Sequence, residues 1–463
     1  MNISKYISYV LLTFALLTGR SDFAQQYLLE PVITGLTSPV AFTFLPNDNV
    51  ILTQRGGLAR IFTLNNVHVS NFWNFTDSTV TGGEKGLLGV CLDPNYTVNR
   101  FVYFYYIHTG NVYRVVRLTE NSNIGTNPFI VFQDTTATGS IHVAGNIRFG
   151  RDGKLYISIG DNGTSSNSQS LTTFKGKMLR INSNGTIPSD NPFFDDGNPK
   201  TGNDDRIWAL GLRNSFDFSF SPVNDSLYAT ENSAGTPDEV NFIRKGKNYG
   251  WPICEGPCFP YNPLYKEPIT SLPGTGAQNY APTGIMVYTG SQMPELVNRL
   301  IVVGAGSGPL FKGLLKCELG NAPFYDTVTS KTIMLNINGR STLMQGSDGY
   351  IYMMNLGGSI ERVKYDLTGI NNNNIPVGYS LSQNYPNPFN PLTGIKYEIP
   401  KDGYVTLKIF NALGMEITTL VNETKQQGSY EVTWDASNFP SGVYFYELTA
   451  GEFTERKKMV LVK

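Results

Sequence analysis

Two residues of the sequence, His142 and Asp161, have the types and spacing that proton transfer requires. His142 stands in a segment of small residues, and Asp161 follows the apolar, strand-like run Leu155–Gly160. A histidine on a turn and a carboxylate at the exit of the next strand can come within hydrogen-bond distance of each other. The carboxylate would then fix the tautomer of the imidazole and raise its basicity, as a general base requires. A turn histidine that is only polar surface is the alternative.

Two further stretches suit an anionic ligand and a cation. Arg213-Asn214 follows a glycine turn, and a guanidinium beside an amide can bind a carboxylate-rich ligand. A structural arginine is the alternative there. The segment Glu231–Asn241 is rich in oxygen atoms, of which calcium takes about six to eight, backbone carbonyls included. Its spacing is not that of an EF-hand, so an acidic surface loop is an equal alternative.

The four cysteines predict one disulfide and no zinc site. Cys254 and Cys258 are close together in a Pro/Gly-rich loop, so in an oxidising compartment they are expected to be bonded. Cys91 and Cys317 lie in apolar runs and are expected to be buried thiols. Zinc is disfavoured because no Cys-x-x-Cys pair exists and the chain has only 3 histidines.

The composition predicts an all-β protein. Among 463 residues there are 47 Gly, 26 Tyr and 27 Phe, which is typical of many short strands joined by tight turns. The length suits one large β domain followed by a small one. Charged residues are 16% of the chain and the net charge is -1, so nucleic acid and anionic membranes are not expected partners.

The first residues resemble a signal peptide over residues 1–24. Lys5 gives a positive start, and Ile7–Leu17 is an apolar run too short to cross a bilayer comfortably. Cleavage is expected after Ala24. A membrane anchor is the alternative.

One pattern recurs along residues 27–366: a turn with Pro, Asp, Asn or Gly is followed by an apolar strand. Its copies are Leu45–Phe62, Asp93–Tyr106, Gly150–Gly160, Ser221–Glu231, Pro294–Phe311 and Gly346–Val363. Divergent repeats at this spacing predict a six-bladed β-propeller, with a large sandwich or irregular barrel as the alternative. Loops of a propeller gather at the mouth of its channel. The polar segments 161–173, 182–205 and 231–263 are expected there.

A small domain is expected to follow. The run Asn371–Asn374 and Pro376 indicate a linker over residues 367–377. Residues 378–463 then alternate like strands and predict an immunoglobulin-like β-sandwich. The expected strands are Gly394–Pro400, Val405–Phe410, Glu416–Val421, Tyr430–Trp434, Val443–Thr449 and Glu452–Leu461.

This C-terminal region resembles the sorting domain of proteins exported by the type IX secretion system. The matching segments are Leu381–Pro391, Ile395–Pro400, Ile409–Asn411, Trp434-Asp435, Ser441–Tyr446 and Lys457–Leu461. The resemblance implies passage across the outer membrane to the cell surface or the medium. A carbohydrate-binding or generic sandwich is the alternative.

The larger region resembles the glucose/sorbosone dehydrogenases, which are six-bladed propellers that bind pyrroloquinoline quinone through calcium. The matching segments are Gly35–Pro39, Glu84–Gly89, Asp93–Tyr96, His142–Gly145, Phe149–Tyr156, Gly160-Asp161, Gly211–Asn214, Glu231–Asn241 and Asn248–Pro252.

The resemblance also implies roles. His142 falls at the position of the catalytic base, and Asp161 at that of its supporting carboxylate. The quinone-contacting positions fall on Glu84, Arg213, Asn214 and Arg340. The calcium positions are the carbonyls of Ser233 and Ala234, with Asp238 in the same loop.

Some positions depart from the family pattern. Ala144 replaces a usual glycine, Gly304–Ser307 lacks the usual lysine while Lys312 is displaced, and Arg340 stands alone. Pyrroloquinoline quinone carries three carboxylates, so each lost charge-assisted contact would remove about 1–3 kcal/mol of its binding free energy.

The sequence therefore predicts a secreted aldose dehydrogenase that uses pyrroloquinoline quinone and Ca²⁺ and passes electrons to an external acceptor. A calcium-stabilised propeller that binds glycans or a protein without turnover is one alternative. A calcium-dependent propeller hydrolase or lactonase is another.

Overall fold

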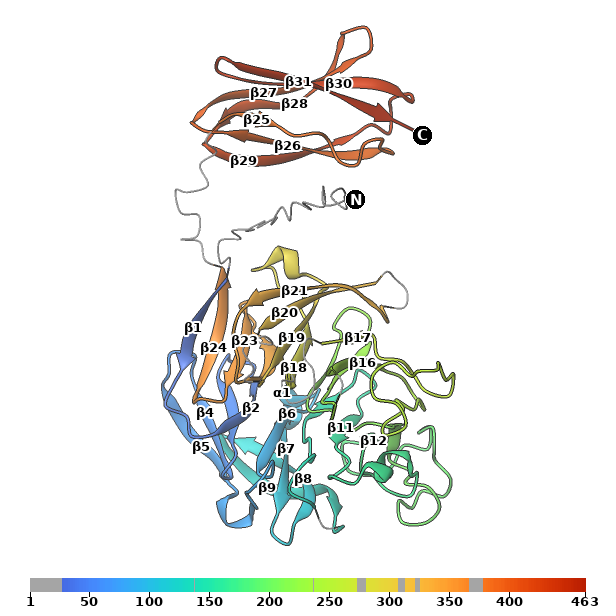
Figure 1. Cartoon of the computed structure of the whole chain (residues 1–463). Coiled ribbons are helices and arrows are strands. Elements are labelled where there is room, and N and C mark those ends of the chain that lie inside the picture. The colour runs from blue at the N-terminus through green and yellow to red at the C-terminus, as the bar shows by residue number, and fades with distance from the viewer. Residues whose placement is uncertain are drawn as a thin grey trace, which may run out of the picture. The chain divides into compact units, whose positions relative to one another are not determined.

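The computed structural model describes residues 27–136, 138–235, 237–272, 280–306, 313–320, 325–365 and 378–463. The expected signal peptide and linker, and Lys312, lie outside these residues. The chain divides into two compact units, residues 1–366 and 367–463 (Figure 1). Among the described residues, no helix has the length and apolar character needed to cross a membrane.

The first unit contains six antiparallel sheets of four strands, which confirms the predicted six-bladed propeller. The first blade comprises β2 (Pro39–Phe44), β3 (Val50–Gln54), β4 (Leu58–Phe62) and β5 (His68–Asn74). The second comprises β6 (Leu87–Leu92), β7 (Phe101–His108), β8 (Val112–Asn121) and β9 (Ile124–Asp134). The third comprises β10 (Ile147–Phe149), β11 (Leu155–Ile159), β12 (Lys177–Ile181) and β13 (Ile207–Leu210).

The remaining blades complete the ring. The fourth comprises β14 (Phe218–Phe220), β15 (Leu227–Glu231), β16 (Glu239–Ile243) and β17 (Thr270–Ser271). The fifth comprises β18 (Pro282–Val287), β19 (Leu300–Gly304), β20 (Leu314–Leu319) and β21 (Val328–Leu335). The sixth comprises β22 (Arg340–Gln345), β23 (Ile351–Asn355), β24 (Ser359–Tyr365) and β1 (Tyr27–Ile33). The short helices are α1 (Tyr96–Asn99), η1 (Thr76–Ser78), η2 (Ser165–Gln169) and η3 (Pro294–Leu296).

The N-terminal strand closes the propeller, because β1 pairs with β24 at the edge of the sixth blade, with Leu29 opposite Val363. Each blade covers the face of the next, so its middle strands are buried on both faces and read as continuous apolar runs. β11 and β19 are accordingly buried at every position. Cys91 and Cys317 are buried free thiols, as expected, and Cys254 and Cys258 form the expected disulfide.

The strand order explains which loops share the mouth. The first strand of a blade starts at the end where the second strand finishes, because the two are antiparallel. Ile147 at the start of β10 therefore pairs with Ile157 near the end of β11. This end of the blades is the mouth of the propeller. The segments that lie there precede β6, β10, β14 and β22, or follow β11 and β15. β12 runs the opposite way, so the expectation that segment 182–205 begins at the mouth is wrong.

The second unit is a β-sandwich, as predicted. One sheet has the order β25-β26-β29 and the other β28-β27-β30-β31. Their bounds are Ser380–Leu381, Leu392–Ile399 and Gly428–Asp435, then Glu416–Lys425, Gly403–Asn411, Gly442–Ala450 and Phe453–Leu461. Inward and outward side chains alternate along β26 and β27, and the core includes Phe389, Trp434 and Tyr446.

Candidate functional site

His142 and Asp161 meet at the mouth of the propeller. Nδ1 of His142 lies 2.6 Å from Oδ1 of Asp161. The two come together because His142 precedes β10 and Asp161 follows β11, which pairs with β10. Asp161 is buried, and the His142 side chain keeps 12% of its exposure. The imidazole is thus held from one side while part of it still faces outward.

The partners of Asp161 define which nitrogen of His142 can act. Burial of Asp161 opposes its ionisation, but hydrogen bonds from His142 and from the indole of Trp251 hold its pKa below the ordinary value. Trp251 Nε1 donates to Oδ2 at 2.9 Å, and the Gly163 amide donates to Oδ1 at 2.8 Å. An ionised carboxylate only accepts hydrogen bonds, so Nδ1 of His142 carries the proton. Nε2 of the neutral ring is then free to accept one.

The backbone of His142 is also constrained. Its φ is +53°, a left-handed value that is rare for a residue with a side chain and that marks stored strain. Its amide donates to Oε2 of Glu84 at 2.7 Å, so Glu84 orients the turn that carries the histidine. A Cβ on Gly160 would lie 2.3 Å from the His142 carbonyl oxygen, so only glycine permits this close approach.

Ala144 shows why a glycine is usual at its position. Its φ is +45°, and the following Gly145 has a φ of +114°. Left-handed backbone costs an L-residue roughly 1–2 kcal/mol that glycine avoids. The Ala144 amide donates to Oδ1 of Asn214 at 3.2 Å, so the strained turn is tied to the segment that begins the next blade.

Arg213 and Asn214 are placed beside the histidine by backbone contacts. The Asp161 amide donates to the Arg213 carbonyl at 2.7 Å. The amides of Arg213 and Asn214 donate to Oε1 of Glu231 at 3.2 and 2.5 Å. The guanidinium donates through Nη1 to the carbonyl of Asn232 at 2.8 Å and lies 5.4 Å from the ring centre of Trp251. Arg213 therefore joins the histidine pair to the loop after β15.

That loop holds the three residues expected at calcium. The Ser233 amide donates to Oδ1 of Asp238 at 2.8 Å, and the Ala281 amide to Oδ2 at 2.7 Å. The amides of Ala234 and Gly235 both donate to Oε1 of Glu255, which sits inside the Cys254–Cys258 disulfide loop. Asp238 thus shapes the loop from within.

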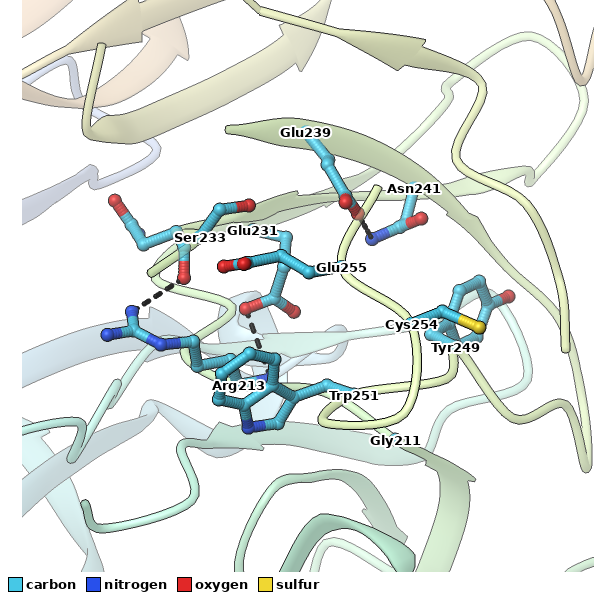
Figure 2. Close-up of a pocket in the computed structure, with 11 residues that line it drawn as sticks. Gly211, Arg213, Glu231, Ser233, Glu239, Asn241, Tyr249, Trp251, Cys254 and Glu255 are labelled. Carbon is cyan, nitrogen blue, oxygen red and sulfur yellow. Dashed lines mark hydrogen bonds between the residues drawn. The ribbon is translucent and has the colours of Figure 1, made fainter. Parts of the chain in front are cut away.

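A pocket lies between this loop and the disulfide loop (Figure 2). Its lining includes Arg213, Glu231, Glu239, Trp251 and Glu255. Burial raises the pKa of Glu231 to about 8, although the Asn214 amide and Ser215 hydroxyl oppose the shift. Burial likewise raises the pKa of Glu239 to about 7. The pocket thus gathers carboxyl oxygens beside the guanidinium of Arg213, and carboxyl oxygens are the donors that a hard cation such as calcium takes.

Arg340 is engaged differently. It begins β22 at the same end of the propeller, but its Nε and Nη2 donate to Glu361 at 2.9 and 3.0 Å. Nη1 donates to the carbonyl of Asn338. No described contact joins Arg340 to the His142–Asp161 pair. The cluster therefore brings together Glu84, His142, Asp161, Arg213, Asn214, Ser233, Ala234 and Asp238, while Arg340 stands apart.

Three residues of the site were not assigned a role from the sequence. Trp251 binds Asp161, Glu231 binds the Arg213-Asn214 turn, and Glu255 binds the Ala234 turn. Trp251 lies in the segment Asn248–Pro252, whose match was already specific, and Glu231 opens the oxygen-rich loop. The sequence signal for Glu255 was its place between two cysteines.

Comparisons with known proteins identify the family of each of the two units. The glucose/sorbosone dehydrogenase family matches residues 36–361, and the secretion system C-terminal sorting domain matches residues 383–463. Aldose sugar dehydrogenase of Escherichia coli is 30% identical over 227 residues, covering 47% of this chain and 60% of that protein. Quinoprotein glucose dehydrogenase B of Acinetobacter calcoaceticus is 28% identical over 266 residues, covering 50% and 54%.

The fold comparison extends over the whole propeller. The crystal structure of an oxidoreductase (glucose dehydrogenase) from Thermus thermophilus covers 73% of this chain and 99% of its own, with 27% identity and a TM-score of 0.63. The chain spans only about half to three-fifths of the two curated dehydrogenases, although it aligns with nearly all of the solved structure. This chain belongs to the glucose/sorbosone dehydrogenase family and ends in a secretion system sorting domain.

Proposed function

We propose that this protein is an exported dehydrogenase that oxidises a hydroxyl group of an aldose with pyrroloquinoline quinone and calcium. The observation that carries the proposal is the His142–Asp161 contact of 2.6 Å at the mouth of a family propeller. The names of two relatives, an aldose sugar dehydrogenase and a quinoprotein glucose dehydrogenase, support the substrate class and the cofactor. The sorting domain supports export to the cell surface or the medium.

In this proposal Nε2 of His142 removes the proton from the sugar hydroxyl, while Asp161 holds Nδ1–H and stabilises the imidazolium that forms. Trp251 keeps the carboxylate oriented through its second oxygen. When bound, the quinone would accept the hydride, and calcium would polarise it as a Lewis acid. Glu84 positions the histidine turn, as its bond to the His142 amide suggests.

The cofactor set we propose is Arg213 and Asn214, with Glu84 and Arg340 at the same mouth, and the calcium set is Ser233, Ala234 and Asp238. Arg213 suits a carboxylate of the quinone because only Nη1 of its guanidinium has a described hydrogen-bond partner. Arg340 contributes less, since its guanidinium is already bonded to Glu361.

The test is a calorimetric titration of the full chain with pyrroloquinoline quinone, in calcium buffer and in EGTA. We expect one-to-one binding that requires calcium, followed by sugar-dependent reduction of an artificial electron acceptor. Quinone that fails to bind at high micromolar concentration in calcium would overturn the proposal.

One observation favours a second candidate, a propeller that binds a glycan or a protein without turnover. Two of the positive charges expected to hold the quinone are weakened or missing. Arg340 is already bonded to Glu361, and the Gly304–Ser307 segment has no lysine. Binding of an oligosaccharide without acceptor reduction, in quinone and calcium, would support this candidate instead.

A further inference from the structure

Three carboxylates in the segment between β12 and β13 have no part in the site at the mouth. One oxygen each of Asp195, Asp196 and Asp205 lies within 4.8 Å of the others. The segment leaves β12 at the end of the blade opposite the mouth, away from the strand end that carries Asp161. This acidic cluster therefore calls for a separate explanation.

Asp205 supplies the observation that points to a ligand. The residue is 0% exposed, and its Oδ1 accepts the Asp195 amide at 2.6 Å. Its Oδ2 is buried and has no hydrogen-bond partner among the residues that the structure describes. Burial removes the hydrogen bonds that a carboxylate oxygen makes to water, and the free-energy cost is large when no protein group replaces them. Asp205 contributes one carboxylate oxygen to the cluster, so an ion bound there would contact this buried carboxylate.

None of the basic side chains that the structure describes provides the missing charge. Across the described ranges, no ion pair to Lys or Arg involves any of the three carboxylates. The adjacent Arg206 instead binds Asp204 at 2.6 Å and Asp134 at 3.3 Å. The Thr201 hydroxyl donates to Oδ2 of Asp196 at 2.5 Å.

The surrounding backbone holds the carboxylate oxygens in place. Oδ2 of Asp195 accepts the Asn203 amide at 2.8 Å, and Oδ1 of Asp196 accepts the Asn198 amide at 2.7 Å. A Cβ on Gly202 would lie 2.3 Å from Oδ2 of Asp195, and Gly202 has a left-handed φ of +61°. Glycine adopts this left-handed backbone readily, so it suits the turn beside Asp195.

We propose that Asp195, Asp196 and Asp205 bind one calcium ion, which fastens the segment before β13 to the third blade. Calcium accepts irregular sets of hard oxygen ligands, so three carboxylates completed by carbonyls and water suit it. Magnesium demands a near-ideal octahedron, and the cluster offers no histidine or cysteine for zinc. The ion pairs with the buried Oδ2 of Asp205 and offsets the repulsion among the three charges.

The first experiment counts calcium ions bound per full-length chain, by equilibrium dialysis without quinone. We expect Asp205→Asn and Asp196→Asn each to lose one ion relative to the unchanged chain. Asp77→Asn, which removes an exposed charge in η1, should lose none. Asp196 is exposed, so its substitution tests the site even if the Asp205 variant does not fold. An unchanged ion count in both cluster variants would overturn the proposal.

A second measurement, thermal unfolding in EGTA and in millimolar calcium, separates an ion site from a purely structural cluster. Calcium should stabilise the Asp77→Asn control more than it stabilises Asp205→Asn, because an ion that binds only the folded state raises its stability. In EGTA, Asp205→Asn should unfold at the same or a higher temperature, since the substitution removes an unpaired buried charge. Equal calcium shifts in both variants would contradict the proposal.

Discussion

Asp161 places one carboxylate oxygen 2.6 Å from Nδ1 of His142, although the two strands β10 and β11 separate these residues in the chain. The pairing leaves Nε2 as the only nitrogen of the neutral ring able to accept a proton. It also depends on the left-handed turn at His142, which the Glu84 carboxylate supports through the histidine amide. Chemistry at this site thus rests on side-chain and backbone contacts together.

The first prediction concerns that base. His142→Ala should lower kcat for sugar-dependent acceptor reduction by about 10²–10⁴-fold, the usual contribution of a general base. The quinone affinity should change little, and the melting temperature should fall only modestly, because Asp161 loses one donor but keeps those of Trp251 and Gly163. His68→Ala, an exposed histidine in the first blade, is the matched control and should retain full activity. Unchanged turnover in His142→Ala would remove the histidine from the mechanism.

The second prediction ranks the two arginines of the proposed cofactor site. Arg213→Ala should weaken quinone binding by about five- to a hundred-fold, since a charge-assisted contact contributes roughly 1–3 kcal/mol. Arg340→Ala should weaken it by less than about fivefold, because Glu361 already engages that guanidinium. It should instead lower the melting temperature, as Glu361 loses its partner. Calorimetric titration and thermal unfolding of both variants measure this, and the reverse ranking would contradict it.

The third prediction is a pH dependence of stability due to Glu231. Burial raises its pKa from 4.5 to about 8, so between these values the folded chain keeps a proton that the unfolded chain releases. The free energy of unfolding must therefore fall as the pH rises from about 4.5 to 8. Glu231→Gln should flatten that slope, because the amide never ionises.

Urea unfolding in EGTA at several pH values would measure the slope. Glu452→Gln, an exposed carboxyl of the sandwich, serves as the control and should keep the slope of the unchanged chain. If Glu231→Gln keeps it as well, the carboxyl is ionised throughout and the proposed cause is wrong.

Much of the fold could be predicted because its signals are local. Turn residues followed by apolar strands recur once per blade, and the middle strands are apolar at every position because both faces are covered. The sandwich strands alternate for the opposite reason, since each has one exposed face. The start of segment 182–205 was misplaced because its position depends on the direction of β12, which local composition does not reveal.

The site was predictable only in part, because several of its contacts depend on how strands pair and not on local sequence. The pairing of His142 with Asp161 follows from a turn and the next strand end. The bond between Arg340 and Glu361 joins β22 to β24, and that between Glu231 and the Asn214 amide joins a strand end to the preceding turn. Such partners depend on register within a blade. That Oδ2 of Asp205 has no hydrogen-bond partner within the described part of the chain is likewise a property of packing.

The fourth prediction concerns export. Removing residues 378–463 should leave the propeller in the periplasm of a host with a type IX secretion system, whereas the full chain should reach the cell surface or the medium. Cell fractionation with an antibody to the propeller would measure this. His142→Ala in the full chain is the control, since it leaves the sorting domain unchanged. Export of the truncated chain would show that the domain has another role.

The last prediction tests the strained turn beside the base. Ala144→Gly should change the free energy of unfolding by less than about 1 kcal/mol, because relief of the left-handed backbone offsets the lost methyl group and the greater freedom of the unfolded chain. Ala209→Gly is the matched control, as Ala209 is equally buried but lies within β13. Ala209→Gly should lower the free energy of unfolding by about 1–2 kcal/mol, because the backbone there has no strain to relieve. Equal losses in urea unfolding would mean that the Ala144 turn stores no strain, and the usual glycine there would need another explanation.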